Sequence, residues 1–132
     1  MKPRLVFVCV ENSCRSQMAE GFARLHGAGL VEPFSAGSRP SGKVNETAAA
    51  LMKEKGVDLG LQTSKGLDAL PAGKWAAVVT MGCGDACPHL AAERRLDWAL
   101  PDPKHLPPDE FRRVRDEIEA RVKALIADVA AS

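Results

Sequence analysis

The residues from Cys9 to Ser16 are the part of the chain best suited to nucleophilic chemistry on an anion. They read CVENSCRS, so five residues separate Cys9 from Arg15. A stretch of this length can wrap into a loop whose backbone N–H groups converge on one centre, and such a loop binds anions. Arg15 can then hold two oxygens of the anion with its planar guanidinium group. We therefore expect a tetrahedral oxyanion to bind here, with Cys9 as the nucleophile.

The expected oxyanion-binding groups are the backbone of the loop and the arginine side chain, contributed by Val10, Glu11, Asn12, Ser13, Cys14 and Arg15. Ser16 is placed to donate a hydrogen bond to the sulfur of Cys9. Asn12 tolerates the left-handed backbone conformation that a tight loop requires. A second interpretation makes Cys9 a buried residue at the end of a strand and Arg15 a surface residue of a helix.

The segments on either side of the loop favour the catalytic interpretation. Leu5 to Cys9 is a continuous apolar run, which predicts a strand buried on both faces. Met18, Phe22 and Leu25 recur at helical spacing and predict a helix from Ser16 to His26. A helix that begins here points the positive end of its dipole at the loop. That field favours a bound anion and a cysteine in its thiolate form.

The remaining segments alternate between strand-like and helix-like patterns. We predict further strands at Leu30–Ala36, Ala76–Met81 and Leu96–Trp98. We predict a helix that Asn45 caps and Gly56 ends. A last helix should begin after Pro107-Pro108 and carry the apolar stripe Phe111, Val114, Ile118, Val122, Leu125 and Val129.

This alternation is typical of an α/β fold with parallel strands joined by right-handed crossovers. Pro33 cannot donate a hydrogen bond to a neighbouring strand, so the second strand should lie at a sheet edge. We predict a doubly wound four-stranded parallel sheet in the order 2-1-3-4, with helices on both faces, in a single domain over residues 1–132. Ligands of such sheets bind at the carboxyl ends of strands one and three, where Cys9 and Cys83 are expected.

The composition excludes several classes of partner. The net charge is +1, and no basic run is long enough to suggest nucleic-acid binding or a membrane surface. The apolar run near the N-terminus is too short for a signal peptide or a membrane span. Four cysteines in such a chain point to a reducing, cytoplasmic setting, where clustered thiols are catalytic, redox-active or metal-bound. We also expect a monomer.

The segment CVENSCRSQMAEGF, residues 9–22, resembles thioredoxin-coupled arsenate reductases, which share the low-molecular-weight protein tyrosine phosphatase fold. The likeness continues through residues 35–37, 63–64, 79–85 and 98–103 and so covers nearly the whole chain. It implies that Cys9 is the nucleophile, Arg15 the oxyanion clamp and Asp102 the general acid. Asp102-Pro103 follows the fourth predicted strand, and an acid there can protonate the leaving oxygen. A simple turn is the alternative for this dipeptide.

Cys83 and Cys87 distinguish a reductase from a phosphatase. A phosphatase needs one cysteine, whereas a reductase needs further thiols to supply two electrons and form a disulfide. Glycines flank Cys83 and free its backbone to approach Cys9, and Cys87 lies close enough in sequence to resolve the first disulfide by exchange. The alternatives are two small buried residues, or a zinc site that also uses His89 and Cys14.

We therefore expect reduction of arsenate to arsenite by Cys9 with a Cys83/Cys87 relay, no bound cofactor or metal, and thioredoxin as the electron donor. The main alternative is a low-molecular-weight protein tyrosine phosphatase, although the chain has no tyrosine and lacks aromatic residues after Asp102-Pro103. An oxyanion-binding redox module without turnover is a further alternative. Some relatives carry an aspartate that helps to hold potassium at the position of Lys65, so we expect no potassium requirement here.

Overall fold

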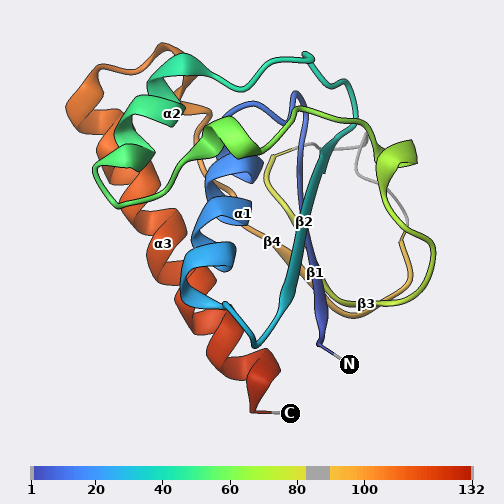
Figure 1. Cartoon of the computed structure of the whole chain (residues 1–132). Coiled ribbons are helices and arrows are strands. Elements are labelled where there is room, and N and C mark those ends of the chain that lie inside the picture. The colour runs from blue at the N-terminus through green and yellow to red at the C-terminus, as the bar shows by residue number, and fades with distance from the viewer. Residues whose placement is uncertain (1, 83–89, 132) are drawn as a thin grey trace.

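Four parallel strands form the centre of the protein in a computed structural model that describes residues 2–82 and 90–131. The strands are β1 (Arg4–Cys9), β2 (Glu32–Gly37), β3 (Trp75–Thr80) and β4 (Ala92–Asp97). They lie in the order β2-β1-β3-β4 (Figure 1), as the sequence predicts. All three pairs are parallel, so the carboxyl ends of the strands meet at one edge of the sheet.

The two edge strands owe their positions to different residues. In β2, Pro33 pairs with Leu5 of β1, and its missing N–H does no harm because β2 has no second neighbour. The opposite edge, β4, begins four residues earlier than the predicted Leu96 and ends at Asp97. The prediction was wrong here because Glu93-Arg94-Arg95 interrupts the apolar pattern. Charged residues suit a strand whose outer side faces solvent.

The three α-helices pack on one face of the sheet. They are α1 (Arg15–His26), α2 (Glu46–Lys53) and α3 (Pro108–Ala130), and Figure 1 shows α1 and α3 running side by side. The side chain of Asn45 accepts the backbone N–H of Ala48 at 2.9 Å, which confirms the predicted cap of α2. Every residue of the predicted stripe on α3 is buried: Phe111, Val114, Ile118, Val122, Leu125 and Val129. These helices and the inward side chains of β1 and β3 form the larger core.

The other face of the sheet is covered more thinly. It carries a smaller buried cluster of Val6, Val8, Trp75 and Val78. Phe34 meets Trp75 edge to face at 5.3 Å between ring centroids, and the short 3-10 helix η2 (Leu67–Ala69) contributes Leu67. Helices thus lie on both faces, as predicted, with α1, α2 and α3 on one face and the short η2 on the other. Among the described residues, no helix combines the length and apolar character that a bilayer span requires.

Candidate functional site

A cavity of about 210 Å³ opens where β1 passes into α1. Its lining consists of the last residue of β1, four loop residues, the first residue of α1 and one acid from the segment after β4: Cys9, Val10, Glu11, Ser13, Cys14, Arg15 and Asp102. Cys9 is 2% exposed and is the last residue of β1, and Arg15 is the first residue of α1. The strand and the helix therefore place the predicted nucleophile and the predicted clamp around one hollow, which we call the cradle.

Ser16 links the nucleophile to the loop. Its Oγ lies 2.8 Å from the sulfur of Cys9. The amide nitrogen of Asn12 donates a hydrogen bond to the same Oγ at 2.7 Å. Because Asn12 supplies a proton to this oxygen, the hydroxyl hydrogen of Ser16 is free to point at the sulfur. The predicted contact between Ser16 and Cys9 is confirmed.

Asn12 fixes the shape of the loop from behind. Its φ of 51° is the left-handed conformation that the sequence predicts for it. Its side-chain oxygen accepts hydrogen bonds from the backbone N–H of Lys65 and from Gln17 Nε2, both at 2.9 Å. Gln62 Nε2 in turn donates to Gln17 Oε1 at 2.7 Å. Sequence reasoning missed this buried amide chain, and its one signal was a glutamine directly before Met18, in the first turn of a helix that the apolar residues Met18 and Phe22 anchor.

Arg15 is held at the side of the cradle by contacts with two distant segments. One terminal nitrogen donates to the backbone oxygen of Leu100 at 3.1 Å, and the other lies 3.9 Å from the carboxylate of Asp102. The side chain is only 9% exposed, so water competes weakly for it. Gly82 packs beside it with a φ of +76°, and a Cβ there would lie 2.8 Å from the guanidinium. Sequence analysis did not identify this role of Gly82.

Asp102 lies at the mouth of the cradle, opposite the loop. One carboxylate oxygen accepts the backbone N–H of Lys104 at 3.1 Å, and the other faces Arg15. The residue therefore caps the 3-10 helix η4 (Pro103–His105) and lines the cavity at the same time. Asp102-Pro103 can therefore form a turn and still hold a catalytic position. One carboxylate oxygen of Asp102 caps the turn, and the other faces Arg15.

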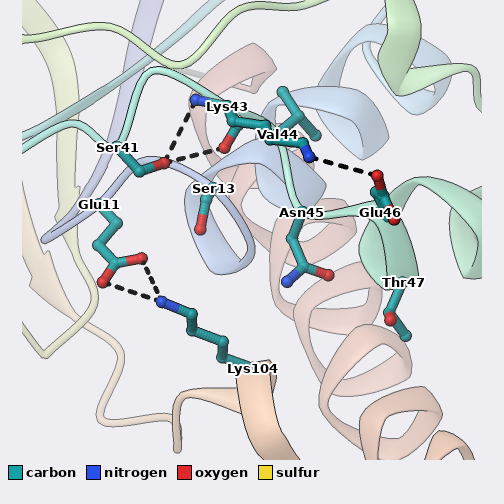
Figure 2. Close-up of a pocket in the computed structure, with 9 residues that line it drawn as sticks. All are labelled: Glu11, Ser13, Ser41, Lys43, Val44, Asn45, Glu46, Thr47 and Lys104. Carbon is teal, nitrogen blue, oxygen red and sulfur yellow. Dashed lines mark hydrogen bonds and ion pairs between the residues drawn. The ribbon is translucent and has the colours of Figure 1, made fainter.

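Lys104 also extends to the loop. Its ammonium contacts both carboxylate oxygens of Glu11, at 3.1 and 3.3 Å. The hydrogen bond to Glu11 raises the pKa of Lys104 above its usual value. Glu11 and Lys104 also line a second, more open hollow of about 470 Å³ beside the cradle (Figure 2).

Cys14 is the other cysteine of the loop, and its environment differs from that of Cys9. Burial raises its pKa to about 12, and the hydrogen bond from the Ser13 hydroxyl, at 3.8 Å, only partly opposes this. Cys14 therefore stays a thiol at neutral pH, and thiols are poor nucleophiles. Its side chain packs into the larger core.

The ammonium of Lys65 occupies a polar position behind the loop. It donates to the backbone oxygen of Thr63 at 3.0 Å and to Ser35 Oγ at 3.3 Å, and it lies 3.5 Å from the carboxylate of Glu20. Lys65 thus pairs with a buried carboxylate. Lys65 meets Asn12 through its backbone N–H and not through its ammonium. Nothing in these contacts tests the predicted independence of potassium.

Cys83 and Cys87, the predicted redox pair, lie outside the described residues, as does His89. The described chain reaches Gly82, directly beside Arg15, and resumes at Leu90. Within residues 2–82 and 90–131, no group of three histidine, cysteine, aspartate or glutamate side chains is arranged to hold a metal ion. The relay and its zinc alternative therefore both stay predictions.

The loop between β1 and α1, with Cys9, Arg15 and Asp102 around it, falls within the match to one known family. The sequence model of the low molecular weight phosphotyrosine protein phosphatases matches residues 4–132. The chain belongs to this family. Within the family, a glutaredoxin arsenate reductase from Synechocystis is 40% identical over 129 residues, which cover 96% of this chain and 98% of the relative.

Solved structures described as arsenate reductases are also similar to this chain. A structure described as an arsenate reductase in the phosphate binding state has a TM-score of 0.89 and 42% identity, covering 98% of this chain and 99% of its own. A thioredoxin-dependent arsenate reductase from Corynebacterium glutamicum has a TM-score of 0.79 and 31% identity, covering 97% of this chain and 62% of its own. These matches favour the arsenate reductases over the tyrosine phosphatases among family members.

Proposed function

We propose that this protein reduces arsenate to arsenite, with Cys9 as the nucleophile and Cys83 and Cys87 as the thiols that carry the electrons away. The observation that carries the proposal is the cradle, in which the sulfur of Cys9, the guanidinium of Arg15 and the carboxyl group of Asp102 face one cavity of about 210 Å³. The similarity to arsenate reductases over nearly the full chain supports the choice of substrate.

The first step forms a bond between sulfur and arsenic. The Cys9 thiolate attacks arsenic(V) while Arg15 and the backbone N–H groups from Val10 to Cys14 hold the arsenate oxygens. One oxygen leaves as water after Asp102 donates its proton. The hydrogen bond from Ser16 stabilises the sulfur anion before the attack and loosens as its charge moves onto the oxyanion.

The second step transfers two electrons. Cys83 as a thiolate attacks the sulfur of Cys9, so that a disulfide forms and the sulfur–arsenic bond breaks. The bonding pair stays on arsenic, which leaves as arsenite. Cys87 then attacks Cys83, which releases the Cys9 thiolate and leaves a Cys83–Cys87 disulfide for an external dithiol to reduce.

Thioredoxin is the proposed reductant, in a cytoplasmic setting. The thioredoxin-dependent structural relative supports this choice. The relative from Synechocystis is named for glutaredoxin, so a glutaredoxin system is the second candidate. Three residues separate Cys83 from Cys87, and a disulfide across so short a gap forms when the Cα atoms come within about 4.4–6.8 Å of each other.

A coupled assay tests the proposal. NADPH oxidation is followed in the presence of thioredoxin and thioredoxin reductase, with and without arsenate, and in parallel with glutathione, glutaredoxin and glutathione reductase. We expect arsenate-dependent oxidation that Cys9→Ser abolishes. Cys83→Ser should keep slow hydrolysis of an aryl phosphate but produce no arsenite, and Cys87→Ser should stop after about one turnover. Rapid aryl phosphate hydrolysis without any arsenate-dependent oxidation would favour the phosphatase instead.

A further inference from the structure

The ion pair between Glu11 and Lys104 joins the two sides of the cradle. Glu11 belongs to the loop after β1, and Lys104 follows Asp102 on the segment after β4, 93 residues away in sequence. The ammonium lies 3.1 and 3.3 Å from the two carboxylate oxygens. Figure 2 shows the two side chains pointing toward each other across the open hollow.

Glu11 is an unusual neighbour for an anion site. It lines the cradle together with Cys9 and Arg15, so the loop that would hold an oxyanion also carries a carboxylate. A negative side chain there repels a doubly charged ligand, unless a cation compensates it. Lys104 provides that cation. Both side chains are a little under two-fifths exposed, so their interaction with each other and with a ligand is only partly screened.

Lys104 acts on the cradle through two separate groups. Its backbone N–H holds one carboxylate oxygen of Asp102, at 3.1 Å. Its side chain holds Glu11. A substitution of the side chain therefore removes the charge next to Glu11 but leaves the hydrogen bond that orients Asp102. The charge effect can be measured without disturbing the proposed acid.

We propose that Lys104 sets the affinity of the cradle for anions, because it neutralises Glu11 so that a dianionic oxyanion can enter. The proposal rests on the proposed function only in that the cradle binds an oxyanion. Lys104 contributes to affinity for the anion and not to the chemical step. The pair itself adds no net charge at the mouth of the cradle, where Asp102 also lies, and Arg15 remains the cation that faces the ligand.

The experiment compares phosphate binding by calorimetry, at about pH 8 and low salt, in the full chain and four variants. Lys104→Met should weaken phosphate binding about threefold to fivefold, because the carboxylate of Glu11 is then uncompensated. Glu11→Gln should strengthen binding about twofold, because the ammonium of Lys104 is then unopposed. The double variant should bind within about twofold of the unchanged protein. Lys104→Arg should bind like the unchanged protein, since it keeps the charge.

Lys43→Met is the matched control. Lys43 lines the same open hollow, but it pairs with Glu46 of α2, at 3.3 Å, and not with the loop. Its removal should leave phosphate affinity unchanged. All differences between the variants should shrink at about 0.5 M salt. In the arsenate assay, Lys104→Met should raise KM and leave kcat unaltered, because Asp102 keeps its backbone partner.

The two single variants should change phosphate affinity in opposite directions, and this difference is the decisive result. If Lys104→Met and Glu11→Gln both weaken phosphate binding, or if neither changes it, the proposal is overturned. A double variant that binds phosphate as weakly as Lys104→Met alone would also overturn it, since the loss would then not depend on the carboxylate of Glu11. If the unchanged protein and Arg15→Ala bind phosphate equally poorly, the oxyanion site itself is wrong. Failure of the arsenate assay alone, with the expected phosphate pattern, would contradict only the proposed reaction.

Discussion

Ser16 Oγ lies 2.8 Å from the sulfur of Cys9, and both atoms are buried. The hydroxyl is oriented by the amide of Asn12, which donates to the same oxygen. A buried sulfur that accepts a hydrogen bond is better stabilised as an anion than one surrounded by apolar groups. In the proposed reaction, this contact prepares Cys9 for attack.

Replacing Ser16 should slow the chemistry of Cys9. We expect Ser16→Ala to reduce the rate of Cys9 alkylation by iodoacetamide at neutral pH about tenfold, because the thiolate loses a charge-assisted hydrogen bond. Mass spectrometry that resolves Cys9 from Cys14 provides the rate. Ser41→Ala is the control, since Ser41 bonds to Lys43 on the exposed side of the chain. Equal rates in both variants would contradict a role for the hydroxyl.

Gly82 should be required for the position of Arg15. Gly82→Ala would place a Cβ 2.8 Å from the guanidinium, in a residue whose φ is +76°. We expect phosphate affinity to fall about tenfold as the clamp is displaced. Gly56→Ala is the matched control, because Gly56 has a φ of +79° and nothing within 4 Å of the added atom. Both variants should lose about 1–2 kcal/mol of stability to backbone strain, but only Gly82→Ala should lose phosphate affinity.

Cys14 should make the protein less stable in alkaline solution. Burial raises the pKa of Cys14 from 9.0 to about 12, so between these values the folded state keeps a proton that the unfolded state releases. The free energy of unfolding should therefore fall as the pH rises above about 9, by up to about 1.4 kcal/mol per pH unit.

Urea unfolding under reducing conditions at several pH values measures this slope. Cys14→Ala removes the titrating thiol, so its stability should depend less on pH over the same range. Its stability at neutral pH should be lower than that of the unchanged protein, because a buried side chain becomes smaller. An unchanged alkaline slope in Cys14→Ala would assign the effect to other groups.

Because of Lys65, the stability and activity of the protein should not depend on which monovalent cation is present. Its ammonium already contacts oxygens of Thr63, Ser35 and Glu20, which are the kinds of ligands that potassium would use. We expect the same melting temperature and arsenate turnover in potassium and sodium chloride. Lys65→Met should lower stability by about 1–3 kcal/mol, because Glu20 loses a partner while buried. A clear rise in melting temperature with potassium in the unchanged protein would contradict this.

Local pattern was sufficient to predict the sheet and the position of the loop. Pro33 identified an edge strand, and the alternation of elements then left few possible strand orders. The spacing of Cys9, Arg15 and Ser16 predicted their approach because one strand and one helix carry them. The start of β4 was missed because charged residues at a sheet edge follow no apolar pattern.

Contacts between distant segments could not be predicted from the local pattern of apolar and polar residues. The pairing of Gln17 with Gln62 and of Glu11 with Lys104 joins residues 45 and 93 positions apart. Polar side chains such as these are unremarkable in sequence, because most lie in solvent. Their partners are determined by the packing of whole elements, which periodicity does not describe. The sequence indicated Gly82 only as a flexible neighbour of Cys83, and its place beside Arg15 was missed because α1 brings Arg15 there.

The amide chain behind the loop has a consequence for the speed of binding. Asn12, Gln17 and Gln62 satisfy one another's hydrogen bonds without any ligand. The conformational entropy of the loop is therefore lost when the protein folds, and an arriving anion need not order it again. Association should then be limited by encounter and by the removal of water, and this loop itself should need no slow closing motion. A pre-organised loop of this kind selects ligands by fit to a fixed shape.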